Sequence, residues 1–177
     1  VYTGNPGCGK TSYLARVAHQ CLVFNFELFK KFGKKRQVRS NIRFSKDIQL
    51  KYVGFFEHFE DLEDIDSLRD TDLIIDELSL YFDSHNWESL PRRTKKFLRL
   101  HRHYGCNIFG AAQDFKSVDT SFRRLVDKGN LFVFDRIVAS KEPLSHLPPL
   151  RHPYLFTIKR QVKATSFDDE KIEYRYI

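Results

Sequence analysis

Residues 4–11 of this chain read GNPGCGKT, which matches the pattern G-x-x-x-x-G-K-[ST] of a phosphate-binding loop. In this pattern the glycines let the backbone curl around a phosphate, and the helix that follows adds the positive end of its dipole. Lys10 is expected to reach the β- and γ-phosphates of a nucleotide, and the Thr11 hydroxyl is expected to face Mg²⁺. The residues expected to line the nucleotide are Gly4, Asn5, Pro6, Gly7, Cys8, Gly9, Lys10, Thr11 and Ser12. A glycine-rich turn without a ligand is the alternative.

A second motif is an apolar run, residues 73–75, that ends in the carboxylates Asp76 and Glu77. Such a run predicts a buried strand. Asp76 is predicted to hold Mg²⁺ together with Thr11, and Glu77 is predicted to polarise an attacking water. The alternative is that the two acids form a helix cap or a surface turn. The phosphate-binding loop in the same chain favours the metal-binding interpretation over this alternative. The pair favours hydrolysis over phosphate transfer to a small-molecule acceptor.

Strand and helix patterns alternate along the chain, which predicts one α/β domain over residues 1–177 with a P-loop NTPase fold. The expected helices cover 11–21, 92–104 and 122–127, and an apolar stretch to Phe32 either extends or follows the first of them. The expected strands cover 1–3, 38–44, 73–76, 106–113 and 131–138. A C-terminal antiparallel hairpin is expected from 154–162 and 171–177, a short acidic helix or loop over 57–70, an irregular segment over 80–91 and a loop at 147–149. The sheet is therefore expected to be mainly parallel, with helices on both faces.

Ligands of such sheets bind where the strands end, so the loop, the Asp76–Glu77 pair and Gln113 are expected to converge. Gln113 is predicted to sense the γ-phosphate or orient the water, with a polar residue at the start of a loop as the alternative. An arginine from a neighbouring subunit is expected to assist hydrolysis. Arg102 is the chosen candidate, beside Arg99, Arg123 and Arg124, although each also suits a surface or DNA-facing position. Trp87 is expected to anchor segment 80–91, with a position facing DNA or a partner as the alternative.

The chain has a formal charge of +7, and its basic residues are unevenly placed. Segment 30–46 holds eight basic residues and no acid, segment 92–102 holds six more, and the acids gather between 57 and 77. A solvated surface is one interpretation of such runs. The other is a face that binds a polyanion, most simply DNA.

The three cysteines lack metal-ligand spacing, which favours free thiols in a reducing, cytoplasmic setting. No apolar run approaches the roughly 18–20 residues that span a bilayer, and the N-terminus does not resemble a signal peptide. The chain has no methionine and begins three residues before the loop. We therefore expect a fragment of a longer protein with a truncated first strand.

Together these motifs resemble the N-terminal ATPase domain of the zonula occludens toxin (Zot) family, which includes filamentous-phage assembly proteins and belongs to the FtsK–HerA branch of P-loop ATPases. The resemblance rests on the loop, on Ser40-Asn41-Ile42, on Asp76-Glu77, on residues 100–105 (LHRHYG), on the strand ending in Gln113, and on Val118-Asp119 with Phe122-Arg123-Arg124. The Arg-His-x-Gly element at 102–105 is its most specific part.

The resemblance implies a motor that hydrolyses ATP with Mg²⁺ to extrude or package phage DNA. It also implies a homo-oligomer, for example a hexameric ring, at the cytoplasmic face of the inner membrane. In the family a transmembrane segment follows the ATPase domain, so membrane contact is expected only through regions absent from this chain. Two rival functions are a small-molecule kinase, for which no acceptor motif is evident, and a nucleotide-gated assembly module without turnover.

Overall fold

In the computed structural model, residues 1–62, 64–126, 132–134, 161–163 and 173–175 are described. The described strands form one sheet in the order β3-β2-β4-β5-β1-β6-β7-β8. Their bounds are β1 Tyr2–Gly4, β2 Gln37–Ser40, β3 Phe56–His58, β4 Thr71–Ile75, β5 Asn107–Ala112, β6 Phe132–Phe134, β7 Gln161–Lys163 and β8 Glu173–Arg175. The strands from β3 to β6 in this order pair in parallel, and β7 pairs antiparallel with β6 and β8. The expected mainly parallel sheet and the antiparallel C-terminal pair are both confirmed.

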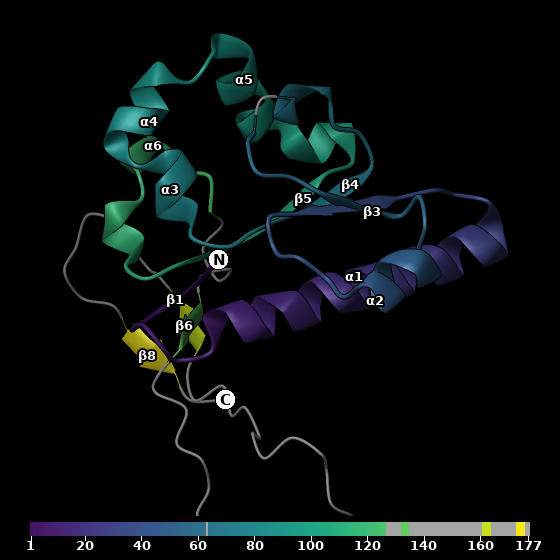
Figure 1. The fold of residues 1–177 in the computed structure, drawn as a ribbon. Coiled ribbons are helices and arrows are strands. Elements are labelled where there is room, and N and C mark those ends of the chain that lie inside the picture. Colours follow the sequence, from purple (N-terminus) through teal and green to yellow (C-terminus); the bar gives the residue numbers. More distant parts are fainter. Residues whose placement is uncertain (63, 127–131, 135–160, 164–172, 176–177) are drawn as a thin grey trace, which may run out of the picture.

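Helices lie on both faces of the sheet (Figure 1). Their bounds are α1 Lys10–Phe32, α2 Lys46–Lys51, α3 Leu78–Phe82, α4 Ser84–Ser89, α5 Arg92–Leu100 and α6 Thr120–Arg123, with 3₁₀ turns η1 Ile65–Ser67, η2 His101–Tyr104 and η3 Phe115–Ser117. The long helix α1 packs against β2, β4 and β5. On the other face, α3 packs against β5, with α4, α5 and α6 grouped around it (Figure 1). Within the described residues, no helix has both the length and the apolar character needed to cross a bilayer.

Strand β4 is buried on both sides, as its apolar run predicts. Leu73 and Ile75 join a core with Phe82 and the helices around α3, whereas Ile74 joins the core beneath α1. This division follows from the alternation of side chains across a strand. Because both faces are covered, β4 is fixed in the centre of the molecule and delivers residues 76 and 77 to the carboxyl edge of the sheet.

The first helix includes the apolar stretch after residue 21. The sequence predicts a helix over 11–21 that the stretch to Phe32 either extends or follows, and in the structure the stretch extends it: α1 continues to Phe32 and ends at Gly33, which has φ 68° and donates its N–H to the Phe29 carbonyl at 2.8 Å. A left-handed glycine is a common end for a helix. The helix continues because Leu22 and Asn25 extend its buried stripe past residue 21.

The prediction of an irregular segment over 80–91 is wrong, because this segment contains the end of α3 and all of α4. The polar residues read as loop formers include a helix cap: the Asp83 side chain accepts from the Asn86 N–H at 2.7 Å. Trp87 is buried and its ring packs against Phe82 and Phe122, so its anchoring role is confirmed. Segment 57–70 contains most of edge strand β3 and the turn η1.

Other boundaries differ by a few residues. The helix expected over 92–104 forms as α5 followed by η2, and it ends at Gly105 with φ 68°. Strand β2 ends at Ser40 rather than at residue 44, and the helix expected over 122–127 is α6, which begins at Thr120. The loop expected at 147–149 lies outside the described residues.

Candidate nucleotide-binding site

The loop between β1 and α1 has the backbone shape of a phosphate cradle. Gly7 has φ 76° and Gly9 has φ 91°, so a side chain at either position would strain the backbone. Gly9 is the N-cap of α1 and offers no side chain to the N–H groups of the first turn. These groups and the positive end of the helix dipole are therefore suited to an anion.

Lys10 brings a positive charge into this loop. Its ammonium donates to the carbonyl oxygens of Gly4 at 2.7 Å and Asn5 at 3.1 Å, and lies 3.7 Å from the Cys8 sulfur. The residue is buried although it is charged, which is tolerated because these acceptors replace water. The predicted phosphate-binding lysine thus lies inside the loop.

Thr11 and Asp76, predicted to share Mg²⁺, are in contact: the Thr11 hydroxyl donates to Asp76 Oδ2 at 2.7 Å. Asp76 Oδ1 is buried and has no hydrogen-bond partner among the described residues. Mg²⁺ prefers oxygen ligands and usually takes one or two from the protein, the rest from phosphates and water. In the described part of the chain, no group of three or more His, Cys, Asp or Glu side chains is placed to hold a metal alone. The pair therefore fits a Mg²⁺ ion that accompanies a nucleotide.

Asn41 holds the backbone of Asp76, a contact that sequence reasoning missed. Its side-chain Nδ2 donates to the Asp76 carbonyl at 2.8 Å, while its Oδ1 accepts from the Asp76 N–H at 2.7 Å. Nδ2 also lies 3.4 Å from the hydroxyl of Tyr81, which donates to the Glu60 carbonyl. We expected a strand through residue 44, whereas β2 ends just before Asn41, which frees this side chain to reach the neighbouring strand end.

Glu77 and Gln113 also meet at this edge, with Gln113 Nε2 donating to Glu77 Oε1 at 3.2 Å. Strand β5 lies between β1 and β4. Gln113 therefore follows the strand that separates the loop from the carboxylates. Glu77 has φ 56° and ψ 64°, a conformation that non-glycine residues rarely adopt and that is frequent at functional sites. The expected convergence is observed, while the catalytic roles of Glu77 and Gln113 stay predictions.

Arg102 lies apart from these residues. It belongs to η2, directly before β5, and borders a hollow with Val1 and Asn107 at the amino edge of the sheet. Because the loop lies at the carboxyl edge, Arg102 does not join the site within one subunit. Its predicted action on a neighbouring subunit stays a prediction.

The basic segment 30–46 divides by residue type. Its three arginines pair with carboxylates: Arg36 with Asp72 at 2.6 Å, Arg39 with Glu57 at 3.0 Å and Arg43 with Glu60 at 2.7 Å. The pKa of Arg36 is raised above its ordinary value, mainly by its hydrogen bonds to Asp72. Arginine suits such pairs because its planar fork matches a carboxylate. Of the lysines in this segment, only Lys30 forms an ion pair within the described residues.

The basic segment 92–102 presents one exposed face. Arg92, Lys96 and Arg99 are exposed and recur at helical spacing along α5, opposite the buried Phe97 and Leu98. None of these three cations forms an ion pair with a described residue, although Arg93 pairs with Asp66 at 3.2 Å. This face therefore retains its positive charge.

Known proteins resemble this chain in sequence and in structure. A family model described as Zonular occludens toxin (Zot) matches residues 1–137. The chain belongs to the Zot family. No curated protein matches the chain significantly.

Two solved structures are similar to this chain. One similar structure is the N-terminal domain of zonular occludens toxin from Neisseria meningitidis, with 25% identity and a TM-score of 0.44 over 75% of this chain and 73% of that one. Another is the genome packaging NTPase B204 from Sulfolobus turreted icosahedral virus 2 in complex with AMP, with 13% identity and a TM-score of 0.51 over 99% of this chain and 96% of that one. This second likeness supports the P-loop fold of the Zot family member described here.

Proposed function

We propose that this domain hydrolyses ATP and drives a motor for phage assembly, either by extruding the particle or by packaging and translocating DNA. The observation that carries the proposal is the contact between Thr11 and Asp76 beside Lys10. The Glu77–Gln113 pair lies next along the same edge. Membership of the Zot family supports the assembly role, and the likeness to a genome packaging NTPase supports the fold that such a motor needs.

The residues divide the chemistry of hydrolysis among them. The loop N–H groups and Lys10 bind the phosphates. Thr11 and Asp76 would hold Mg²⁺, which would neutralise phosphate charge. Glu77 orients a water and takes its proton as the water oxygen bonds to the γ-phosphorus. The bond to the β–γ bridging oxygen breaks, which leaves ADP and inorganic phosphate. Gln113 holds the Glu77 carboxylate toward that water.

A steady-state ATPase assay with Mg²⁺ tests this proposal. Wild-type protein should release inorganic phosphate, and Lys10→Ala should abolish release because the phosphates lose their cation. Lys46→Ala is the matched control, since Lys46 is an exposed lysine away from the loop. ATP binding without turnover, even with DNA and at oligomeric concentrations, would contradict hydrolysis and favour the gated assembly module. Phosphate found on an added nucleoside would instead indicate a kinase.

We further propose DNA contact through the exposed face of α5, with the other basic segment, 30–46, as a second candidate. Charge-driven DNA affinity falls steeply with salt. Replacing Arg92, Lys96 and Arg99 together by Glu should remove binding at all DNA sequences. Unchanged affinity, measured by fluorescence anisotropy at several salt concentrations, would count against this face.

We also propose that the active form is a homo-oligomer, such as a hexameric ring, at the cytoplasmic face of the inner membrane. If Arg102 acts across a subunit boundary, Arg102→Ala subunits mixed with Lys10→Ala subunits should regain part of the turnover that each variant lacks alone. The regain follows because each mixed boundary can combine an intact loop with an intact arginine. No regain, with mixing confirmed by sedimentation, would remove Arg102 from the mechanism.

A further inference from the structure

The apolar stripe of α1 continues beyond the part of the helix that is buried in the core. Leu14, Ala18, Leu22 and Asn25 form the buried side of the helix. The same helical spacing continues through Phe29 to Phe32, but these side chains are 42% and 59% exposed. The end of α1 projects past the described strands of the sheet (Figure 1).

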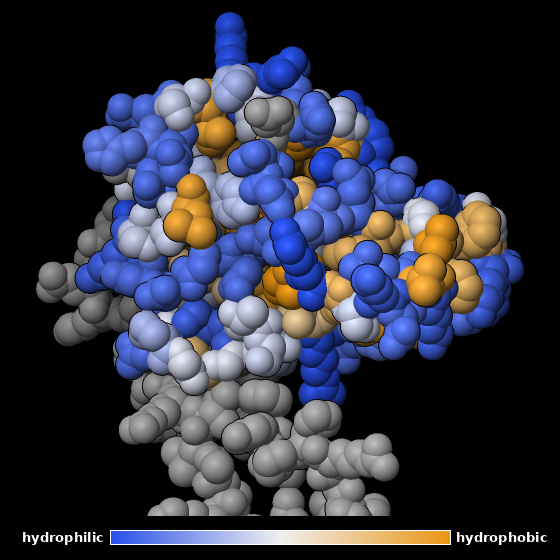
Figure 2. Space-filling view, viewed as in Figure 1, coloured by the Kyte–Doolittle hydropathy of each residue, from blue (hydrophilic) through white to orange (hydrophobic). Residues whose placement is uncertain are grey.

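Helix α2 and the turn after it extend this surface. Leu50 and Val53 are 73% and 71% exposed. Two buried rings, Tyr52 and Phe55, hold the turn to α1. The ring centroid of Phe55 lies 5.4 Å from that of Phe29, and the ring centroid of Tyr52 lies 5.5 Å from that of Phe26. Figure 2 shows orange side chains among blue ones at the end of the molecule where α1 and α2 lie side by side.

Lysines surround these apolar side chains. Their ammonium groups lie over rings: Lys30 over Phe26 at 4.3 Å, Lys31 over Phe32 at 5.2 Å, Lys35 over Phe55 at 5.7 Å and Lys51 over Tyr52 at 5.4 Å. A lysine placed in this way covers apolar surface with its stem and keeps its charge at the rim. Among the described residues, Lys31, Lys35 and Lys51 have no ion-pair partner, while Lys30 pairs with Glu27.

We call these residues the lysine–phenylalanine patch: Phe29, Phe32, Leu50, Val53, Lys30, Lys31, Lys35 and Lys51. We propose that the patch docks on the surface of an anionic lipid bilayer. Its apolar side chains enter the boundary between headgroups and acyl chains, and its lysines meet the lipid phosphates. An amphipathic surface with lysines at its rim matches this boundary in both polarity and charge.

The composition of the patch favours a bilayer over DNA. Phosphate backbones attract lysines, but they give no place to exposed phenylalanine, leucine and valine side chains. Both components are needed for membrane docking, because either a small apolar area or a few lysines alone holds a protein only marginally. The proposal differs from the expectation that membrane contact occurs only through regions outside this chain. It does not depend on ATP hydrolysis.

Vesicle flotation tests the proposal on the chain as it stands. We expect binding to vesicles of equal parts phosphatidylglycerol and phosphatidylcholine, and little binding to phosphatidylcholine alone. Phe29→Ser with Phe32→Ser should weaken binding roughly tenfold, and Lys31→Gln with Lys35→Gln should weaken it by a similar factor. The two lysines are exposed, so their variants should keep the wild-type melting temperature. Phe29→Ser also loses the ring contact with the buried Phe55, so Phe32→Ser is measured alone as well, and it should weaken vesicle binding at the wild-type melting temperature.

Matched controls separate the patch from generic stickiness and charge. Leu80→Ser removes a 68% exposed leucine on α3, outside the patch, and Arg92→Gln with Lys96→Gln removes two charges on α5. Both controls should bind vesicles like wild type. The proposal is overturned if patch and control variants bind equally, or if binding does not require anionic lipid. It is also overturned if the phenylalanine variants lower the sedimentation mass without vesicles, because the patch would then join copies of this chain.

Discussion

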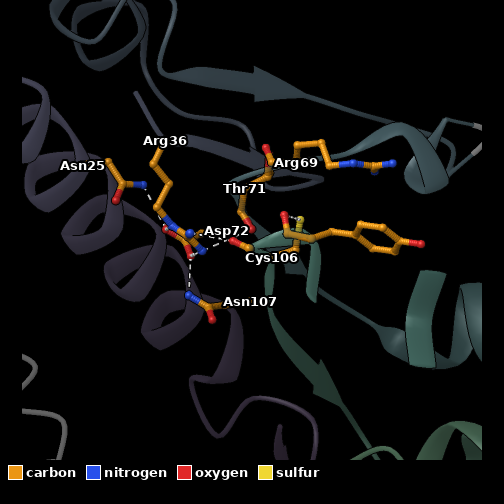
Figure 3. Close-up of polar contacts among 9 residues, drawn as sticks. Asn25, Arg36, Arg69, Thr71, Asp72, Cys106 and Asn107 are labelled. Atoms are coloured by element: carbon orange, nitrogen blue, oxygen red, sulfur yellow. Dashed lines mark hydrogen bonds and ion pairs between the residues drawn. The ribbon is translucent and has the colours of Figure 1, made fainter. Parts of the chain in front are cut away.

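Strand β4 has an aspartate at each end, and the two carboxylates are used differently. At the amino edge, Asp72 accepts four hydrogen bonds within 3.0 Å: two from Arg36, one from Asn25 and one from Asn107 (Figure 3). At the carboxyl edge, Asp76 Oδ2 accepts from Thr11, while its buried Oδ1 has no partner in the described part of the chain. A fully partnered carboxylate stabilises the fold, whereas one with a spare buried oxygen is suited to a ligand.

The substitution Asp76→Asn tests the carboxyl edge and should have the largest effect. We expect kcat for ATP hydrolysis to fall by about 10³-fold, because the carboxylate proposed to hold Mg²⁺ is lost. The free energy of unfolding should change by less than about 1 kcal/mol, since only one hydrogen bond to Asp76 is affected. ATPase assays and urea unfolding measure the two quantities. A large loss of stability with kcat retained would assign Asp76 to the fold instead.

The matched change at the amino edge, Asp72→Asn, should lower the stability of the fold and leave nucleotide binding unchanged. Asp72 is buried, and the partly buried Arg36 guanidinium would lose its counter-charge, so the free energy of unfolding should fall by about 3 kcal/mol. Nucleotide affinity of the folded protein should stay at the wild-type value because the site lies at the opposite edge. Urea unfolding and nucleotide titration check both parts, and weakened nucleotide binding with wild-type stability would contradict the comparison.

Asn41→Ala tests how the carboxyl edge is held. The Asp76 N–H and carbonyl would each lose a partner, so we expect about 1–2 kcal/mol less stability and a higher Mg²⁺ concentration for half-maximal turnover. Asn86→Ala is the control, because Asn86 makes one side-chain bond to the Leu80 carbonyl away from the loop. An unchanged Mg²⁺ requirement would limit Asn41 to a structural role.

The smallest expected effect is on the pH dependence of stability and comes from Cys21, whose thiol pKa is affected by the charge of Asp72. Burial, with a contribution from the Asp72 charge, raises the pKa of this thiol from its ordinary 9.0 to about 11. Below pH 9 the thiol is protonated in both states. As pH rises from 9 to 11, the unfolded chain releases this proton first, so stability should fall in that window. Cys21→Ala should make the fall shallower in urea unfolding at each pH, and an identical slope would refute this.

The sequence was sufficient to predict which residues meet at the carboxyl edge, because the motifs that carry them are local. The loop pattern specifies its own backbone, and the carboxyl-end rule for parallel sheets brings Asp76 and Gln113 to it without knowledge of any side-chain contact. The Asn41 clamp could not be predicted in this way. It depends on β2 lying beside β4 in a register that pairs Ser40 with Ile74, a contact between distant parts of the chain.

The basic runs show a second limit of sequence reasoning. Charge counting treats all cations in segment 30–46 alike, whereas the structure buries part of Arg36 against Asp72 and leaves the lysines outside. The pairing joins residues 36 positions apart, which no helical or strand period records. The prediction of an irregular segment over 80–91 was wrong for a different, local reason. Asp83 ends α3 and caps the start of α4, so a polar residue that is typical of loops joins two helices here.

The length of α1 has a mechanical consequence. With 23 residues the helix is about 34 Å long, beginning in the glycine-rich loop at Lys10 and ending at Phe32. A tilt of about 5° around its first turn would carry the far end through about 3 Å. A rotation small enough to leave the loop intact would therefore be amplified along the helix and would move Phe29 and Phe32 of the lysine–phenylalanine patch by several times more than Lys10.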